Sequence, residues 1–310
     1  MEIIRQEAPF DSTDAVGLWT EIFGREEALL EKPQIDGSET EYNRDVMYLA
    51  YENGQIVGSI HATFPKKAPA FCGLSGMCTH PQVRGTGLGR ILFEKIVSEA
   101  DANGAEYTFL GTSNPLAAKL YHSCGFSFLP GTNIMARFKD GDRFDMDSRF
   151  FREKPAGVTV CEGTPAERIP LIPLAAYRGP FFLMDRNTGI FTSDVVNQVS
   201  CMGIYPRYAD LAASGGRWFT AEDTATKVPG ALLSAVPAEG RVRADFFCAD
   251  GFFDAVPELL SRISGEDVFF EVSVRDEKKR ELLQKNGYRP GKEKTVSVRE
   301  FMIPCITYEK

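Results

Sequence analysis

The amino-acid sequence predicts a mixed α/β (α+β) fold arranged as two tandem domains. The chain has 310 residues, about twice the length of an ordinary domain. In both halves, short strand-like apolar runs alternate with segments of helical period. The stretch from Asn114 to Phe126 also recurs from Asp276 to Tyr288, which indicates an internal duplication. We therefore expect one domain at residues 1–140, a linker at 141–155 and a second domain at 156–310.

Clear boundary signals separate the elements of the first half. Ser12 and Asp14 precede a segment of helical period, and Asn53-Gly54 is a hairpin signal between two strand patterns. Asn103-Gly104 closes the second helix, and Asn114-Pro115 opens the third. The elements expected, in order, are strand 2–6, helix 15–23, strands 46–51, 56–64 and 71–79, helix 88–100, strand 107–110, helix 115–124 and strands 126–128 and 133–138.

The second half repeats the same kinds of element after a polar segment. Residues 139–154 are charged and have no periodic apolar face, which is typical of an interdomain linker. The elements expected beyond them are strands near 158–161, 217–220, 230–236, 242–248 and 268–274, and helical regions at 165–177 and 255–263. The two copies of the repeated stretch lie 162 residues apart, from 114 to 276.

Composition limits the class of protein. With 43% apolar and 25% charged residues, each half can bury an ordinary core. The seven cysteines form no C-x-x-C pair and no Cys/His cluster, so we expect free thiols and no metal site. Glu2 and Arg5 interrupt the first apolar residues, and no apolar run approaches the ~20 residues of a membrane helix. A soluble cytoplasmic protein is expected, and the net charge of −8 argues against a nucleic-acid partner.

The segment Arg84–Gly89, between a predicted strand and a predicted helix, is typical of a phosphate-binding loop. Glycine reaches positive φ values and lets a ligand approach main-chain amides, and a helix N-terminus favours anions. The loop has three glycines, and Arg84 and Arg90 bracket it. A Walker loop is excluded because its Gly-Lys-Ser/Thr ending is absent, and the dinucleotide fingerprint would need glycine at position 90. A glycine-rich turn without a ligand is the structural alternative.

With the loop at residues 84–89 and the stretch that begins at Asn114, the first half resembles the GNAT superfamily of acyl-CoA N-acyltransferases. The family's cofactor loop reads Arg/Gln-x-x-Gly-x-Gly/Ala, and residues 84–89 fit it at every defined position. The Asn-x-x-Ala-x-x-Leu-Tyr pattern from Asn114 fits the family's following helix, in order and at normal distance. The resemblance covers about residues 1–138. It implies a mixed, twisted sheet splayed between its fourth and fifth strands, with the pantetheine arm of acetyl-CoA in the split.

The resemblance also implies which residues contact acetyl-CoA. The pyrophosphate would lie on the loop amides, the pantetheine would pair with the backbone of the fourth strand, and the helix from position 114 would form the other wall. The residues so implied are Met77, Cys78, Thr79, Arg84, Gly85, Thr86, Gly87, Leu88, Gly89, Arg90, Asn114 and Ala117. The first helices would lie beside the acceptor pocket. Residues 1–52 carry 13 Asp and Glu against 4 Lys and Arg, which is either a solvated surface or an attractor for a cationic amine.

Tyr121 is the catalytic residue that the resemblance implies, as proton donor to the departing thiolate. A phenol is protonated at neutral pH and can donate, and ordinary packing of its helix is the structural alternative. No acid stands on the fourth strand, so the general base stays open. It is Glu52, an acid of the first helices acting through water, or no residue at all if the amine arrives unprotonated.

The other reactive side chains have simpler explanations. His61 lies in a predicted strand, and His80 precedes a proline in a turn. Cys78 and Cys124 have no histidine partner at a recognisable spacing. Buried structural thiols are therefore favoured over an acyl-cysteine route.

The second half lacks the equipment of the first. Residues 249–254, after the strand at 242–248, hold one glycine, two acids and no arginine. Leu283 stands in the place of Tyr121, and Asp276 in that of Asn114. We expect a degenerate GNAT-like domain without cofactor binding, whose role would be to pack against the first domain and shape the acceptor pocket.

These observations favour an acetyl-CoA-dependent N-acetyltransferase that acts on a primary amine of a small molecule or peptide. No metal, nucleic acid or membrane is expected to take part, and a homodimer is among the oligomeric states left open. The alternative is a non-catalytic acyl-CoA-binding sensor or regulatory module. The acceptor and the preferred acyl chain are not fixed by the sequence.

Overall fold

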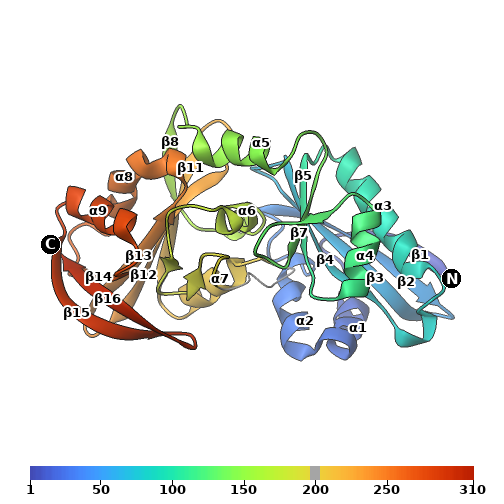
Figure 1. The fold of residues 1–310 in the computed structure, drawn as a ribbon. Coiled ribbons are helices and arrows are strands. Elements are labelled where there is room, and N and C mark those ends of the chain that lie inside the picture. Colours follow the sequence, from blue (N-terminus) through green and yellow to red (C-terminus); the bar gives the residue numbers. More distant parts are fainter. Residues whose placement is uncertain (196–202) are drawn as a thin grey trace. The chain divides into compact units, whose positions relative to one another are not determined.

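Two seven-stranded sheets organise the chain, one in each half (Figure 1). The computed structural model describes residues 1–195 and 203–310. Residues 1–141, 164–172 and 203–205 form the first of two units, and residues 142–163, 173–195 and 206–310 form the second. The mixed α/β class predicted from the sequence is confirmed, with mostly antiparallel sheets flanked by helices.

The first unit contains every element predicted for residues 1–140. Its elements are β1 (Glu2–Glu7), α1 (Thr13–Phe23), α2 (Arg25–Glu31), η1 (Lys32–Gln34), β2 (Asn43–Glu52), β3 (Gln55–Pro65), β4 (Phe71–Thr79), η2 (Pro81–Val83), α3 (Leu88–Ala102), β5 (Tyr107–Gly111), α4 (Pro115–Ser123), β6 (Ser127–Phe128) and β7 (Ile134–Phe138). Strand β4 has the predicted bounds, whereas α2 and η1 were not predicted. Asn53 and Gly54 both have positive φ, as a two-residue hairpin turn requires.

The first sheet has the order β1-β2-β3-β4-β5-β7-β6 and is antiparallel except between β4 and β5. That parallel pair is short: it runs only from Phe71 opposite Tyr107 to Gly73 opposite Phe109. Beyond Gly73, β4 continues to Thr79 with β3 alone as its partner. The sheet therefore splays between its fourth and fifth strands, as the resemblance implied.

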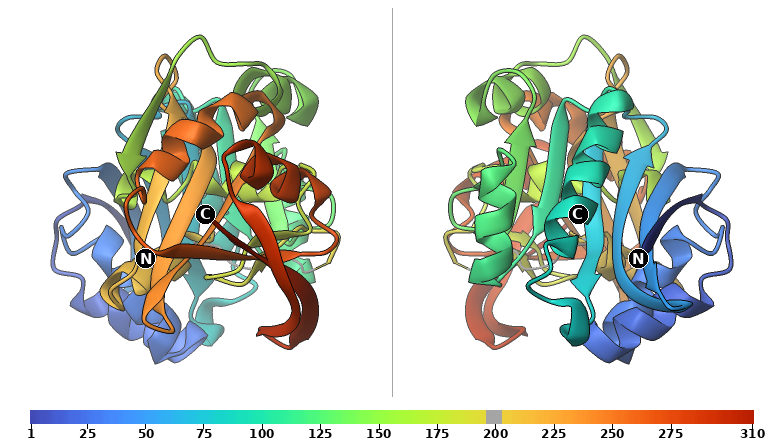
Figure 2. Two further views of the ribbon diagram at one scale, coloured as in Figure 1. Left: turned by 90° about the vertical axis from the view of Figure 1, so that its left-hand side faces the viewer. Right: turned by 90° about the vertical axis from the view of Figure 1, so that its right-hand side faces the viewer.

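Helices cover the two faces of this sheet with separate apolar clusters. Helix α3 packs over β2, β3 and β4, and the right-hand view of Figure 2 shows it in front of the strands with α4 beside it. Its buried residues, among them Leu92, Phe93 and Ile96, join Val46 and Ile60 of the sheet. The cluster of Trp19 from α1 is formed instead with sheet residues such as Met47 and Leu49, which alternate with those of the first cluster.

A segment from the second half of the sequence completes the first unit. Residues 164–172 belong to this unit, and Arg168 forms a buried ion pair with Glu39, its Nε lying 2.9 Å from Oε2. Ile169 packs over Gly73, where a Cβ would meet its Cδ1 at 2.2 Å. The absence of a side chain at Gly73 is what allows this close approach at the base of the split.

All the elements predicted for residues 156–310 are present, and most of them lie in the second unit together with several that were not predicted. Its elements, with η4 and part of α6 contributed to the first unit, are α5 (Arg143–Asp147), η3 (Ser148–Arg152, a π-helical turn), β8 (Val158–Glu162), η4 (Pro165–Glu167), α6 (Leu171–Ala176), β9 (Leu183–Asp185), β10 (Ile190–Phe191), α7 (Tyr205–Ala213), β11 (Arg217–Asp223), β12 (Pro229–Ala238), β13 (Arg241–Cys248), η5 (Asp250–Ala255), α8 (Val256–Ser261), β14 (Val268–Ser273), α9 (Glu277–Lys285), β15 (Arg289–Val298) and β16 (Phe301–Glu309).

The segment predicted as a polar linker is helical. Within residues 141–155, α5 and η3 bury Met146, Phe150 and Phe151. Two short turns of different pitch do not repeat a regular apolar period, which is why the sequence pattern gave no sign of this packing.

The second sheet repeats the strand order of the first. Read from β8, it runs β8-β11-β12-β13-β14-β16-β15, and its parallel pair, β13 with β14, stands where β4 and β5 stand in the first sheet. That pair is again three residues long, from Val242 opposite Val268 to Ala244 opposite Phe270. Helices α4 and α9 begin and end 162 residues apart. The left-hand view of Figure 2 shows α8 and α9 against this second sheet. The shared order supports the internal duplication inferred from the sequence.

Candidate active site

The glycine-rich loop connects the end of β4 to the start of α3. Gly85 and Gly87 have φ of 80° and 88°, in the left-handed region, and Gly87 is the N-cap residue of α3. A Cβ at either position would meet nothing within 4 Å. Glycine is therefore needed here for the backbone conformation and not to relieve crowding.

The loop presents main-chain amides without internal partners. The first amides of α3 have no acceptor within the helix, because an α-helix leaves its N-terminal N–H groups unpaired. Among the residues that the structure describes, none accepts a hydrogen bond from the amides of Gly85, Thr86 or Gly87. These amides and the positive end of the α3 dipole together form a site suited to an anion.

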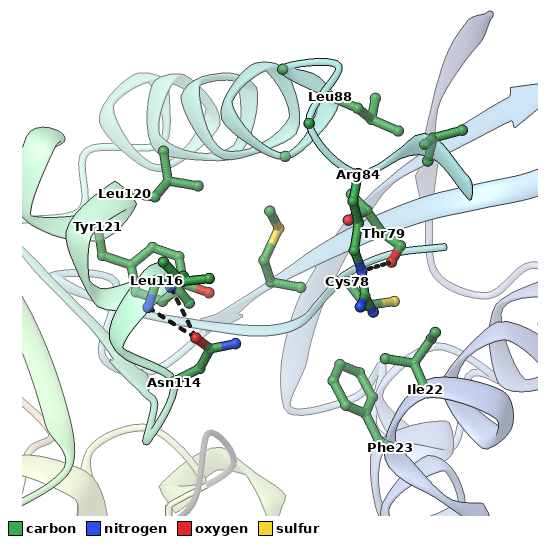
Figure 3. A pocket seen from close by; sticks show the side chains of 16 residues that line it. Ile22, Phe23, Cys78, Thr79, Arg84, Leu88, Asn114, Leu116, Leu120 and Tyr121 are labelled. Atoms are coloured by element: carbon green, nitrogen blue, oxygen red, sulfur yellow. Dashed lines mark hydrogen bonds between the residues drawn. The ribbon is translucent and has the colours of Figure 1, made fainter. Parts of the chain in front are cut away.

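A cavity of about 540 Å³ opens beside this loop (Figure 3). It is lined by Ile22, Phe23, Met77, Cys78, Thr79, Val83, Arg84, Gly85, Gly87, Leu88, Gly89, Asn114, Leu116, Ala117, Leu120 and Tyr121. Figure 3 shows Asn114 and Tyr121 on one side of the cavity and Thr79 and Arg84 on the other. The cavity therefore lies between β4 with its loop and α4, next to the point where the sheet splays.

Most of the residues singled out from the sequence meet at this cavity, and two do not. Thr86 turns its hydroxyl back to donate to the carbonyl of Val83 at 2.7 Å, and Arg90 pairs with Glu94 on the surface of α3. Neither lines the cavity. Their backbone remains part of the loop and of the first turn of α3.

Several lining residues were missed, and their sequence signals are weak. They are Ile22, Phe23, Val83, Leu116 and Leu120. The first two belong to the apolar pattern of α1, which predicts burial in a core equally well. Leu116 is 73% exposed, and nothing in one sequence separates such a residue from an ordinary surface leucine.

The N-cap residue of α4 and the helical spacing of its residues determine which side chains face the cavity. Asn114 is the N-cap residue, and its Oδ1 accepts hydrogen bonds from the amides of Leu116 and Ala117 at 2.9 and 3.4 Å. Ala117 and Tyr121, four residues apart, share the face that lines the cavity. The Tyr121 ring is buried, with its centroid 4.6 Å from that of Phe93. The phenol is therefore held at a fixed place on the cavity wall.

A second cavity, of about 160 Å³, adjoins the first in the gap between β4 and β5. The two share Phe23, Met77, Asn114, Ala117 and Tyr121. The smaller one is lined as well by residues of both diverging strands, among them Ser75 and Leu110. It extends the site into the base of the split.

Two of the reactive side chains named from the sequence, His80 and Cys78, have structural surroundings. His80 caps η2, with Nδ1 accepting from the amide of Gln82 and Nε2 lying 3.1 Å from Glu21. Burial raises the pKa of the Cys78 thiol to about 12, which opposes a thiolate nucleophile at this position. Six cysteines are free, as predicted, and Cys201 lies outside the described residues.

The acids of residues 1–52 are largely engaged in local contacts. Glu7 pairs with Arg5 and Arg44, and the Asp14 carboxylate accepts from the hydroxyl of Tyr51. Among the acids of the first helices, Glu31 is buried beside the bulge in β4: a Cβ at Gly76 would lie 3.0 Å from its Oε2. Glu52, at the end of β2, is exposed and does not line either cavity.

The equivalent split of the second unit is filled by its own chain. Asp276 accepts hydrogen bonds from the amides of Phe182 and Leu183, and Lys279 donates to the carbonyls of Leu183 and Met184 at 2.7 and 3.1 Å. The residues from Phe181 to Asn187, including β9, thereby lie between α9 and β13. We call this segment the plug.

Buried charge holds the plug in place. Lys279 Nζ lies 2.7 Å from Asp245 Oδ1, and both side chains are 1% exposed. The other carboxylate oxygen of Asp245 accepts from the amide of Arg186 at 2.7 Å. Asp185 accepts from the hydroxyls of Tyr208 and Ser234, each at 2.9 Å.

No helix among the described residues is both long and apolar enough to cross a membrane.

Comparison with known proteins identifies the family of the first domain. A model of the acetyltransferase (GNAT) family matches residues 14–126. A search of curated proteins gave no match. Similar solved structures include a GNAT-family acetyltransferase of Staphylococcus aureus Mu50, with 16% identity over 45% of this chain and 100% of that chain and a TM-score of 0.35. The Escherichia coli N-acetyltransferase YhbS in complex with CoA has 18% identity over 45% and 83%, with a TM-score of 0.35. Tetrahymena GCN5 has 12% identity over 44% and 96%, with a TM-score of 0.35.

The matched residues run from α1 to the end of α4 and include both the glycine-rich loop and Tyr121. The first domain of this chain is therefore a member of the acetyltransferase (GNAT) family.

Proposed function

We propose that this chain transfers an acetyl group from acetyl-CoA to a primary amine of a small molecule or peptide. Membership of the acetyltransferase family supports acyl transfer in general, and the acetyl donor and the amine acceptor are the proposed refinements. The observation that carries the proposal is the cavity itself. It joins unpaired loop amides at one end to a buried phenol at the other, along the free edge of β4.

The anion site at the start of α3 is the proposed seat of the pyrophosphate. Of the amides from Arg84 to Arg90, that of Arg84 donates to the carbonyl of Pro81, and the others would hold the pyrophosphate oxygens, with the helix dipole adding to their attraction. Next to it, Met77, Cys78 and Thr79 lie beyond the last residue of β4 that pairs with β5. Their backbone edge is available to pair with the amides of a pantetheine arm, and Asn114 and Ala117 would form the facing wall.

Tyr121 is the proposed proton donor to the leaving sulfur. In direct attack, the amine nitrogen forms a bond to the thioester carbon, the carbon–sulfur bond breaks, and the departing thiolate takes a proton from the phenol. The burial of Tyr121 and its place at both cavities support this role, because a proton donor has to lie within hydrogen-bond reach of the group that it protonates. The high pKa of Cys78 argues against an acyl-cysteine intermediate.

The proposal is tested by incubating the full chain with acetyl-CoA and a panel of polyamines, aminoglycosides and peptides. Thiol release is measured, and the amine product is identified by its added acetyl mass. We expect release with at least one amine class and an acetylated product in equal amount. Tight binding of acetyl-CoA without release for any amine would contradict the proposal and favour an acyl-CoA sensor.

A further inference from the structure

A line of three buried polar side chains runs from the smaller cavity into the first sheet. Ser75 of β4 lies with its Oγ 2.9 Å from Nδ1 of His61 on β3. The other ring nitrogen of His61, Nε2, lies 3.0 Å from Oδ1 of Asp45 on β2. His61 is fully buried, Asp45 is 1% exposed and Ser75 is 7% exposed. Three neighbouring strands thus place a hydroxyl, an imidazole and a carboxylate in one hydrogen-bonded line.

The hydrogen bonds of Asp45 set the direction of this line. Oδ1 of Asp45 also accepts from the hydroxyl of Thr63 at 2.7 Å, and Oδ2 has no hydrogen-bond partner among the described residues. A carboxylate only accepts, so Nε2 of His61 carries its proton toward Asp45. Nδ1 is then the acceptor, and the hydroxyl of Ser75 donates to it. The imidazole is oriented to take a proton from the serine.

Only Ser75 of the three reaches the cavity. It follows Gly73, the last residue of β4 that pairs with β5, by two positions, so it stands where the strands have separated. The smaller cavity is lined by Ser75 from β4 and by Tyr121 from α4. The Ser75 hydroxyl, with His61 behind it, and the Tyr121 phenol thus lie on different walls of one cavity.

Packing does not require this line. A buried carboxylate and imidazole lose their hydration, and apolar residues of similar volume would serve the fold at least as well. The charged group facing His61 is Asp45 from β2, and from β4 it meets Ser75. Gln34 of η1 contacts Thr63, which contacts Asp45 and not His61. Glu31 of α2 lies farther along β4, beside Gly76.

We infer that Ser75 accepts the proton of the attacking amine and passes its own proton to His61, which Asp45 holds in position. This inference rests on the proposed acetyl transfer and supplies its general base.

The proposed step accounts for each bond and each proton. The nitrogen–carbon bond forms and the carbon–sulfur bond breaks. The bound amine is an ammonium ion. Before it attacks, one of its protons moves to Oγ of Ser75 while the serine proton moves to Nδ1 of His61, which frees the nitrogen lone pair. As the carbon–sulfur bond breaks, the Tyr121 proton moves to sulfur and the nitrogen releases its second proton to water. Return of the His61 proton through Ser75 to water and reprotonation of Tyr121 complete the cycle. Ser75 is the catalytic residue, and His61 and Asp45 are positioning residues that act through it.

The test compares the pH dependence of thiol release by wild type, Ser75→Ala and His61→Gln, with saturating acetyl-CoA and the most reactive amine of the panel. Each variant should bind acetyl-CoA with a Kd within about twofold of wild type, which verifies that it is folded. General base catalysis typically contributes ~10²–10⁴-fold, so we expect a loss of at least ~10²-fold at pH 7 in Ser75→Ala. The loss should shrink about tenfold per pH unit up to the pKa of the amine, because only the free amine then reacts.

Two further variants separate this role from a structural one. Ser75→Thr keeps a hydroxyl and should restore most of the rate together with the wild-type pH profile. Ser59→Ala removes a fully buried serine of β3 that lines neither cavity, and it should keep the wild-type profile. A similar profile for Ser75→Ala and wild type would overturn the relay while leaving acetyl transfer intact. The relay would also be overturned if the rate of Glu31→Gln, and not that of Ser75→Ala, rose steeply with pH. An acetyl group found on Ser75 by mass spectrometry would overturn it as well. Absence of thiol release from wild type would overturn both proposals.

Discussion

The two sheets of this chain share one strand order and one short parallel pair, yet their splits differ in content. In the first unit the gap between β4 and β5 opens onto two adjoining cavities. In the second unit the gap between β13 and β14 holds the plug. Topology alone therefore does not decide whether such a sheet binds a ligand. What the neighbouring helix presents to the split decides it.

Corresponding positions on α4 and α9 show how the difference arises. Asn114 uses its side chain to cap its own helix, whereas Asp276, 162 residues later, accepts from amides of the plug. Ala117 lines a cavity, whereas its counterpart Lys279 crosses the same space to reach Asp245. Two changes on one helix face thus replace a ligand's partners with partners from the chain.

The largest effect is expected at the buried cation of the second unit. Lys279→Ala leaves Asp245 buried without its counter-charge, so we expect a loss of ~3–5 kcal/mol in the free energy of unfolding. The chain has two tryptophans, Trp19 in the first unit and Trp218 in the second, so a Trp19→Phe background makes denaturant unfolding of the second unit visible by fluorescence. Lys278→Ala, at the neighbouring lysine whose side chain is 28% exposed, should cost less than ~0.5 kcal/mol. Equal losses for the two lysines would show that this ion pair does not hold the plug.

A smaller effect, on turnover and not on stability, is expected at Tyr121, whose counterpart in the second unit is Leu283. Tyr121→Phe should lower turnover at least ~10-fold, because general acid help is typically worth ~10²–10⁴-fold, with little change in acetyl-CoA affinity. Tyr107→Phe, at a buried tyrosine of β5 that lines neither cavity, is the matched control and should keep its turnover. Unchanged turnover in Tyr121→Phe would remove the residue from the mechanism.

The smallest effect is expected in the loop. Gly87→Ala forces a Cβ onto a residue with φ of 88°, at a cost of ~1–2 kcal/mol in stability, and displaces the amides at the start of α3. We expect the Kd for acetyl-CoA to rise about tenfold by calorimetry. Gly104→Ala is a close match, with φ of 77° and open space around it, and Gly104 lines neither cavity. It should lose similar stability without losing affinity, and a loss of affinity in both variants would argue against a specific role for the loop.

Sequence patterns predicted the parts of the site that local rules govern. The bounds of β4, the Asn53-Gly54 turn and the Asn114 cap depend on neighbouring residues and on backbone preferences. The three loop glycines were predicted to allow positive φ or the approach of a ligand. Gly85 and Gly87 have positive φ, whereas Gly89 lies in the first turn of α3 and does not. The resemblance to the GNAT superfamily implied that the loop and α4 form opposite walls of one site, and residues of both line the larger cavity.

Contacts between residues far apart in the sequence could not be predicted from local patterns. The plug contains a strand of only three residues, too short for a period, and it is held by Asp245, Asp276 and Lys279 from much later in the chain. His61 lies directly opposite Ser75, but the register of β3 with β4 shifts between Ser59 and His61, and nothing in one sequence shows such a shift. The sequence predicted the glycine-rich loop, but neither the buried contacts of Ser75, His61 and Asp45 nor the filled split of the second unit.

The most direct test of this comparison is the stoichiometry of acetyl-CoA binding to the full chain, measured by titration calorimetry. An open split in the first unit and a filled one in the second predict one binding site per chain. Two sites per chain would contradict the account of the plug, and no binding at all would contradict the assignment of the loop and its cavity.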